Sequence, residues 1–216
     1  MKKIAQGAEA IIYLDKKKII KDRISKSYRH PELDKKIIKQ RTKAEIKIMQ
    51  KISKIINVPK LDKSHPKNKI LMEFIDGKKL SQHLNKFPLT KQKQIMKLIG
   101  KAVAKLHQTN IIHGDLTTSN MIYVPKKKNL SLKKGDDMPN NKVYFIDFGL
   151  AFQNAKYEDK GVDIHLLKQA LEAKHFKNWE ILFQEFEKAY KTLEPKEAQK
   201  VFDRLKAIEK RGRYRH

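Results

Sequence analysis

The sequence has 216 residues and no cysteine. The absence of cysteine excludes disulfide bonds, a disulfide-linked partner and zinc sites built from thiolates. Eight histidines are present, but they are scattered without the pairing that is typical of metal ligands. A structural metal is therefore not expected, whereas a Mg²⁺ ion carried by a phosphate ligand remains open.

Long hydrophobic runs are also missing from the sequence. No run approaches the roughly 18 to 20 apolar residues that are needed to cross a bilayer. The first residues, Met1–Gly7, contain no apolar core of the kind found in signal peptides. We therefore expect a soluble, cytoplasmic protein without a membrane partner.

Acidic residues are scarce relative to basic ones. The chain has 24 Asp plus Glu against 50 Lys plus Arg, which gives a formal net charge of +26. Such an imbalance favours binding to a polyanion. A general bias of the source proteome toward lysine would produce the same composition, and charge alone does not distinguish RNA from an acidic protein partner.

Hydrophobic periodicity in the first third of the chain predicts a small sheet and one long helix. Residues 4–24 read as short antiparallel strands. From residue 31 to residue 52, apolar side chains recur at helical spacing. Glu45 lies seven residues from both Ile38 and Ile52 and so shares their apolar face. A carboxylate in that position is expected to have a partner.

The rest of the chain is predominantly helical in pattern. A buried strand at 70–75 ends at a turn, an amphipathic helix follows around 95–106, and further apolar stripes fill 164–208. Two strands are expected on either side of residues 125–142, which read as a long exposed hairpin insertion. The prediction is an α+β chain with an N-terminal lobe at 1–75, a helical C-terminal lobe at 76–209 and a basic tail at 210–216 that leaves the helical pattern.

Three short stretches carry the candidate chemistry. They are the segment 113–120 (His-Gly-Asp-Leu-Thr-Thr-Ser-Asn), the segment 146–149 (Ile-Asp-Phe-Gly), and Lys21 with Glu45 upstream. Transfer or hydrolysis of a γ-phosphate requires cations for the phosphates, oxygen ligands for Mg²⁺ and a group that aligns the nucleophile. These stretches contain each part in the order found in kinases.

Roles follow from residue type and order. Asp147 is expected to bridge Mg²⁺ and the phosphates, Asn120 to bind a second metal, and Asp115 to orient the attacking hydroxyl or water. Lys21 would contact the α- and β-phosphates and be held by Glu45. The backbone groups of Glu73 and Ile75 would meet the adenine where the two lobes join.

On these motifs the chain resembles, over nearly its whole length, the protein-kinase-like superfamily. It is specifically similar to the small atypical kinase subunit of the KEOPS complex, also called the PRPK family. The resemblance also rests on Gln6–Ala10 as a reduced glycine-rich loop, on the segment 158–163 (Glu-Asp-Lys-Gly-Val-Asp) and on Arg211-Gly212-Arg213 near the end.

The resemblance implies a bilobal kinase fold with a shortened activation segment, and ATP with Mg²⁺ or Mn²⁺ as cofactors. Gly7 and Ala8 would lie over the phosphates, whereas His113 and Asp163 would support the catalytic loop rather than take part in chemistry. The implied function is ATP hydrolysis, or autophosphorylation on Ser/Thr, in support of a transferase that makes threonylcarbamoyl-adenosine in tRNA. That transferase, other KEOPS subunits and tRNA are the implied partners.

The end of the chain offers a candidate contact surface. Arg211, Arg213 and Arg215 alternate with other residues in the last six positions. Arginines in a basic tail suit phosphate backbones. We expect these three side chains to contact tRNA or the transferase, with a frayed, functionless terminus as the alternative.

Three features depart from ordinary protein kinases, and the third of them argues against a peptide substrate. Gly114 replaces the arginine that reads a phosphorylated activation loop, and Thr117 stands where the catalytic loop usually has a lysine. Between Asp147 and Asp163 there is no Ala-Pro-Glu segment. The alternatives that stay open are a stand-alone RIO-like kinase, a small-molecule phosphotransferase and a nucleotide-binding scaffold without turnover.

Overall fold

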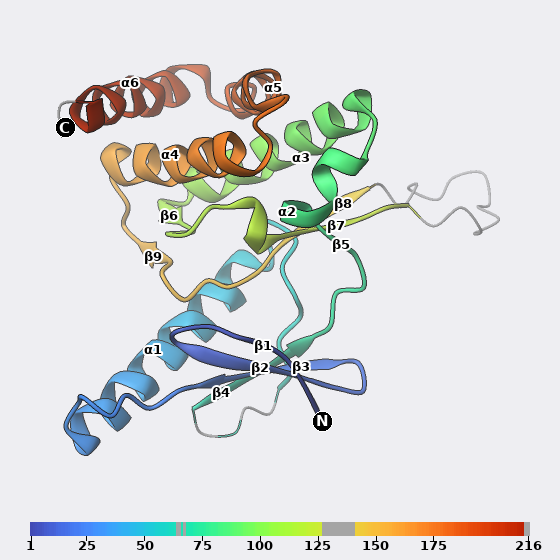
Figure 1. The fold of residues 1–216 in the computed structure, drawn as a ribbon. Coiled ribbons are helices and arrows are strands. Elements are labelled where there is room, and N and C mark those ends of the chain that lie inside the picture. Colours follow the sequence, from blue (N-terminus) through green and yellow to red (C-terminus); the bar gives the residue numbers. More distant parts are fainter. Residues whose placement is uncertain (64–65, 67, 127–140, 214–216) are drawn as a thin grey trace.

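The structure, a computed structural model, describes residues 1–63, 66, 68–126 and 141–213, with only the backbone of Arg213. An antiparallel sheet and a long helix from the first third of the chain lie beneath a larger helical part (Figure 1). The chain passes between them once, at residues 74–77, and later segments of the helical part return to face the sheet. The α+β class expected from the sequence is confirmed.

The N-terminal sheet has four strands in the order β1-β2-β3-β4, all antiparallel. Lys21 lies in the third strand opposite Ile12 and Ile70, so it occupies the middle of the sheet. The elements of this part are β1 (Lys2–Gln6), β2 (Ala10–Asp15), β3 (Lys18–Arg23), α1 (Pro31–Ile52) and β4 (Lys69–Glu73).

The helix α1 begins at Pro31, where the ring fixes a helical φ and the missing N–H costs no hydrogen bond. One side of α1 is buried and includes Ile38, Ile48 and Ile52, as the apolar spacing predicts. Glu45 is on the same side and is only 2% exposed. The helix therefore presents a carboxylate to the sheet.

The helical part contains two small sheets, β5-β7-β8 and β6-β9, beside its helices. The pairing of β7 with β8 confirms the predicted hairpin strands. Residues 127–140 of the predicted insertion lie outside the described residues. The elements are β5 (Lys78–Lys79), α2 (Leu80–His83), η1 (Leu84–Lys86), α3 (Leu89–Gln108), β6 (Ile111–Ile112), η2 (Thr118–Asn120), β7 (Met121–Val124), β8 (Lys142–Phe145), β9 (Phe152–Gln153), α4 (Tyr157–Lys174), α5 (Trp179–Tyr190) and α6 (Pro195–Arg213).

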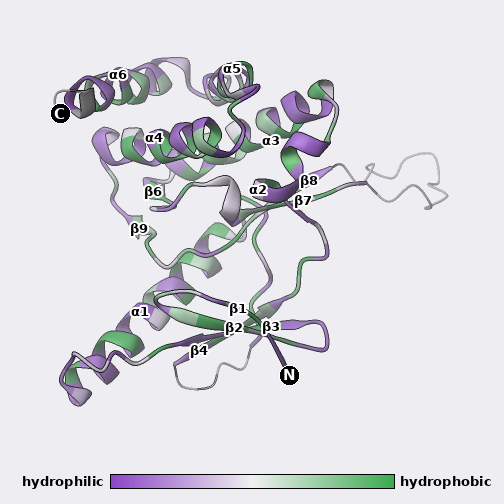
Figure 2. Ribbon diagram, viewed as in Figure 1, coloured by the Kyte–Doolittle hydropathy of each residue, from purple (hydrophilic) through white to green (hydrophobic). Residues whose placement is uncertain are grey.

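The core of the helical part lies between α3, α4, α5 and α6, whose hydrophobic residues alternate with polar ones along each ribbon (Figure 2). Gly100 lets α3 and α5 approach closely. A Cβ on Gly100 would lie 2.5 Å from the carbonyl oxygen of Phe186 and 2.9 Å from the Cβ of Ala189. The glycine is thus required by packing and not by backbone conformation.

The expected end of helical pattern at Lys210 is wrong, because α6 continues to Arg213. Lysine and arginine are good helix formers. Arg211 also forms an ion pair with Glu158 on α4. Local propensity and this contact together extend the helix.

Within the described residues, no helix combines the length and the apolar character needed to cross a membrane.

Replacing Gly100 with alanine tests the packing of α3 against α5. At an exposed position inside a helix, alanine is normally more favourable than glycine by about 1 kcal/mol. Here the methyl group would overlap the backbone of α5, so we expect Gly100→Ala to lower the free energy of unfolding by about 1–2 kcal/mol. Urea denaturation measures the change, with Lys101→Ala on the exposed side of α3 as the control. A more stable Gly100→Ala protein would contradict the close approach.

Candidate active site

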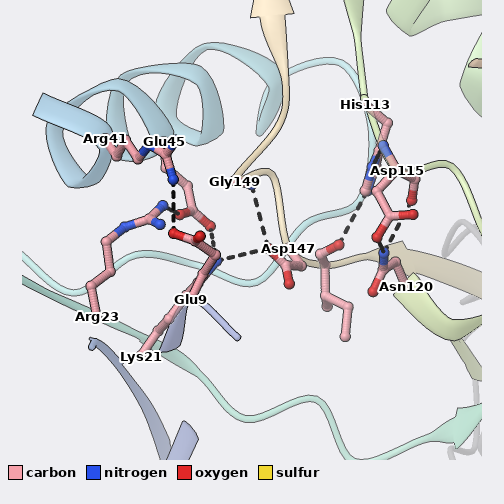
Figure 3. Close-up of polar contacts among 11 residues, drawn as sticks. Glu9, Lys21, Arg23, Arg41, Glu45, His113, Asp115, Asn120, Asp147 and Gly149 are labelled. Atoms are coloured by element: carbon pink, nitrogen blue, oxygen red, sulfur yellow. Dashed lines mark hydrogen bonds and ion pairs between the residues drawn. The ribbon is translucent and has the colours of Figure 1, made fainter. Parts of the chain in front are cut away.

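Lys21 links the two parts of the molecule. Its Nζ lies 2.6 Å from Oε1 of Glu45 on α1 and 2.7 Å from Oδ1 of Asp147 in the loop after β8. The side chains of Lys21 and Glu45 are 6% and 1% exposed. Figure 3 shows the three groups meeting beside the sheet. Residues 126 positions apart in the sequence are therefore joined by one ammonium group.

Asp147 is held in a conformation that few residues adopt. Its φ is 64°, in the left-handed region, which is unfavourable for a residue with a side chain. Burial by itself would raise the pKa of Asp147. The charge of Lys21 and hydrogen bonds from Lys21 and the Gly149 N–H outweigh it, so the pKa lies below its usual value. Asp147 is therefore an anion available to a metal cation.

Asp115 and Asn120 lie together in the catalytic loop, by which we mean residues 113–120. The Nδ2 of Asn120 donates to Oδ2 of Asp115 at 2.8 Å and to the Asp115 carbonyl at 3.0 Å. Both donors of the amide are thus used within the loop. Its oxygen remains the atom that can face a metal.

Asp163, buried on α4, holds the start of the catalytic loop. Its two carboxylate oxygens accept the backbone N–H groups of His113 and Gly114, each at 2.9 Å. His107 on α3 lies 3.2 Å from the same carboxylate. The contacts are those of a group that positions a loop backbone rather than one that reacts.

His113 is buried and packs on the ring of Phe148 with a centroid distance of 4.6 Å. Its Nε2 donates to the carbonyl of Ile146 at 3.1 Å. Burial lowers the pKa of His113, against the opposing influence of Asp163. The neutral ring is held by Phe148 and by the Ile146 carbonyl. It therefore supports the loop and is not placed to transfer a proton.

The structure shows why position 114 is a glycine, which the sequence did not reveal. Its φ is +78°, and a Cβ there would lie 2.2 Å from the carbonyl oxygen of Leu150. No other residue type fits without a shift of the backbone. The short segment after Gly149 therefore packs directly against the catalytic loop.

A cavity of about 580 Å³ lies at the junction of the sheet and the helical part. The site residues predicted from the sequence that line it are Gly7, Ala8, Lys21, Glu45, Glu73, Ile75, Asp115, Asn120 and Asp147. His113, within the catalytic loop, and Asp163, which accepts from the loop backbone, do not line it. One cavity thus gathers the residues of all three motifs.

Two ends of this cavity suit different parts of a nucleotide. A Cβ on Gly7 would have no neighbour closer than 4.0 Å, so the space above the loop between β1 and β2 is open. At the other end, the Glu73 N–H donates to the Lys60 carbonyl at 2.8 Å. No described residue accepts a hydrogen bond from the Ile75 N–H, which leaves that group for a ligand.

The structure does not bring Arg211 to this cavity. Arg211 is exposed on α6, where it pairs with Glu158. Arg213 is described by its backbone alone, and Arg215 lies outside the described residues. Their expected contact with tRNA or a transferase stays a prediction.

The sequence assigned no role to three charged residues that line the same cavity. Glu9 and Arg41 form an ion pair at 2.7 Å that joins the loop before β2 to α1. Arg23 is buried, and its Nη2 lies 2.5 Å from Oε2 of Glu45. A signal was present, because residues two apart on a strand share a face, so Arg23 had to follow Lys21 toward Glu45.

His175 is a further buried residue tied to the catalytic loop. Its Nδ1 donates to Oδ1 of Asn85 at 2.7 Å, and its Nε2 accepts from the hydroxyl of Thr118 at 3.1 Å. Burial, with the charge of Lys174, lowers the pKa of His175 to about 4. The bond from Thr118 requires the neutral ring, because a protonated Nε2 cannot accept.

Comparison with known proteins places the chain in a family. Residues 1–193 match the family model described as "Protein kinase domain". The chain is 41% identical over 228 residues to the KEOPS complex subunit Bud32 of Pyrococcus abyssi, an alignment that covers 100% of this chain and 97% of that protein. The chain therefore belongs to the protein kinase family and, within it, to the Bud32 family of atypical kinases.

Two further similarities extend this result. The chain is 33% identical to a probable bifunctional tRNA threonylcarbamoyladenosine biosynthesis protein of Methanosarcina mazei. The alignment covers 96% of this chain and 35% of that protein. It thus spans about a third of that relative. The Rio2 kinase of Chaetomium thermophilum, solved as an ADP/Mg²⁺-phosphoaspartate complex, has a TM-score of 0.57 at 16% identity, over 95% of this chain and 70% of that one. At this identity the likeness shows the fold alone.

These findings confirm the resemblance to the KEOPS kinase family and the kinase-like fold expected from the sequence. They also confirm the expectation of an atypical kinase. The RIO-like alternative is supported only in part, since it rests on shared fold without close sequence similarity.

The environment of His175 predicts a pH dependence of stability. The unfolded chain has an ordinary His pKa near 6.5 and the folded chain a pKa of about 4, so the unfolded state binds more protons between these values. The stability that the neutral His175 gives the folded state is complete above about pH 6.5 and is lost as the pH falls toward 4. We expect His175→Gln to flatten the fall in unfolding free energy over this window, measured by urea denaturation. A slope equal to that of the unmodified chain would contradict the assignment. His30→Gln, which changes an exposed histidine, is the control.

Proposed function

We propose that this chain is an Mg·ATP-dependent kinase or ATPase that acts as a subunit of a KEOPS-type complex and supports threonylcarbamoyl-adenosine modification of tRNA. The observation that carries the proposal is the meeting of Lys21, Glu45 and Asp147 with the Asp115–Asn120 pair around one cavity. Residues 1–75 and 76–209 would form the lobes on either side.

The nucleotide would lie between the two ends of the cavity. The adenine would meet backbone groups of Glu73 and Ile75, and the free Ile75 N–H supports this orientation. The phosphates would extend beneath Gly7 and Ala8 toward Lys21, where Glu45 holds the ammonium group. Open space above Gly7 is consistent with a loop that must approach phosphate oxygens closely.

The metal would be held by the Asp147 carboxylate and the Asn120 amide oxygen. No described residues form a cluster of three or more acidic, His or Cys ligands that could hold a metal without help. Mg²⁺ usually takes one or two protein carboxylates and completes its shell with phosphate and water. The donor set fits Mg²⁺, or Mn²⁺, that arrives with ATP and neutralises the charge that develops on the phosphoryl group.

Asp115 would orient the attacking oxygen. Its carboxylate accepts from Asn120, which fixes its direction, and Asp163 and His113 support the loop that carries both. Asp163 lies only 16 positions after Asp147, and the segment between them contains the short strand β9 and the start of α4. A segment this short leaves little platform for a peptide, which favours water or a Ser/Thr hydroxyl of the same chain as the acceptor.

The names of the relatives support the choice of partners. One relative is a KEOPS subunit, and another joins a homologous segment to a longer tRNA threonylcarbamoyladenosine biosynthesis protein. We propose a transferase, other KEOPS subunits and tRNA as partners of this chain. The net charge of +26 is compatible with tRNA phosphates.

Asp147→Ala tests the metal role. We expect the variant to lose phosphate release from ATP by about a hundredfold or more, the scale seen when one charge-stabilising group is removed from an active site. Release is measured with purified chain plus transferase, and binding of the transferase is measured in parallel. Asp203→Ala, which removes an exposed carboxylate on α6, is the control.

The position of the label identifies the acceptor. With γ-labelled ATP, tRNA and the transferase, label in free phosphate shows hydrolysis, and label on this chain shows autophosphorylation. Label on the transferase or on tRNA would replace the proposed acceptor. Equal release by Asp147→Ala and the unmodified chain would favour a nucleotide-binding scaffold instead.

Neutralising the C-terminal arginines tests the proposed tRNA contact. If Arg211, Arg213 and Arg215 meet phosphates, replacing all three with glutamine should flatten the dependence of log affinity on log salt by roughly 2 to 3 units. Binding of tRNA is measured between low and moderate salt. The control variant replaces Lys35, Lys36 and Lys39 with glutamine. These lysines are exposed on α1, so the control loses the same amount of charge at another place. Equal slopes for the two triple variants would leave only a general charge effect.

A further inference from the structure

Arg23 is a buried cation that the roles proposed above leave unused. It lies on β3 two residues after Lys21 and on the same face of the strand. Only 4% of its side chain is exposed, and it lines the cavity. Figure 3 shows its guanidinium reaching Glu45 from the side opposite Lys21.

The guanidinium group is only partly satisfied by its neighbours. Nη2 lies 2.5 Å from Oε2 of Glu45. Nε is buried and has no hydrogen-bond partner among the described residues. Leaving a buried donor unpaired is costly, and such donors in functional sites often await a ligand.

The local charge points to the same conclusion. Glu45 is shared by two cations, since Oε1 meets Lys21 and Oε2 meets Arg23. A second negative charge comes from Asp147, through Lys21. When the carboxylate of Asp147 binds a metal cation, Lys21, Arg23 and Glu45 are left with an excess positive charge in a buried place. An anion is then required to offset it.

Gly149 lines the cavity and is flanked by the groups that such an anion would meet. A Cβ built on Gly149 would lie 3.2 Å from Oδ1 of Asp147 and 3.6 Å from both Nη2 of Arg23 and Nζ of Lys21. The missing side chain therefore leaves a position flanked by both cations and by the proposed metal ligand. A phosphate oxygen that bridges a metal and two cations has this environment.

The catalytic loop supplies a reason for a second cation here. Thr117 occupies the position where kinases usually place a lysine, so one positive charge near the phosphoryl group is missing. Arginine is well suited to replace it, because its planar fork can bind a carboxylate and a phosphate at the same time.

We propose that Arg23 binds a phosphate oxygen of the nucleotide together with Lys21. The inference rests on the proposed nucleotide site and adds a residue to it. Glu45 then positions two cations, and Arg23 supplies the charge that the catalytic loop lacks.

The test compares ligands with and without phosphates. Affinities for ATP, tripolyphosphate and adenosine are measured with excess Mg²⁺ for the unmodified chain and for Arg23→Gln. We expect the variant to bind ATP and tripolyphosphate at least about tenfold more weakly, the effect of losing one charge-assisted hydrogen bond, and adenosine within twofold of normal. Arg23→Lys keeps the charge but not the fork, and should fall between the two.

Arg29→Gln is the matched control. Arg29 also pairs with a buried carboxylate of α1, since its Nη1 lies 3.2 Å from Oδ1 of Asp34, but it does not line the cavity. It should leave the ratio of ATP to adenosine affinity unchanged.

Three outcomes would overturn the inference. Equal weakening of adenosine and ATP by Arg23→Gln would show that Arg23 only supports Glu45. Unchanged affinity for all three ligands would show that Arg23 does not reach the phosphates. If Arg23→Gln fails to fold, Arg23→Lys decides, and normal ATP affinity in that variant contradicts the role of the fork. Failure of the unmodified chain to bind ATP or tripolyphosphate would overturn the nucleotide site itself.

Discussion

The buried carboxylate of Glu45 is the group on which the site depends. The Glu45 side chain is 1% exposed, and burying a charge is unfavourable unless partners compensate for the lost water. Lys21 and Arg23 supply that compensation from β3, so a helix and a strand are fixed relative to each other by electrostatic necessity. Lys21 then extends the network to Asp147 and so to the helical part. The same contacts that make burial tolerable also align the cations with the cavity.

A second buried carboxylate, Asp163, organises the other side of the cavity. It receives two backbone N–H groups of the catalytic loop and contacts His107, whose other nitrogen lies 2.9 Å from the hydroxyl of Tyr190 on α5. His175 holds the far end of the same loop through Thr118. The loop that carries Asp115 and Asn120 is therefore anchored to α3, α4 and α5. Asp115 and Asn120 can be held in a fixed direction without any contact to the N-terminal sheet.

Much of the fold could be predicted because its signals are local. Hydrophobic spacing in 31–52 and around 95–106 predicted α1 and α3. Asn110, two residues after α3, adopts a left-handed φ of 54°, a conformation that is common at helix ends. The motif order placed Lys21, Glu45 and Asp147 in one site, and the structure brings them within hydrogen-bond distance. His175 escaped prediction because its partner Thr118 lies 57 positions away, whereas Arg23 could have been found from its place two residues after Lys21 on the same strand face. The prediction that the helical pattern stops before Lys210 was wrong, because the pair between Arg211 and Glu158 is also non-local.

The sequence by itself determined the family, the class of fold and the residue types available for phosphate and metal, since motif order and hydrophobic period are properties of neighbouring residues. Only the tertiary structure decided that two cations share Glu45 and that α6 includes Arg211. It also decided that position 114 must be a glycine, because the backbone there has a positive φ and lies against Leu150. The physical reason is that charge compensation and close packing depend on distances across the fold. Those distances exist only after the sheet and the helices have met.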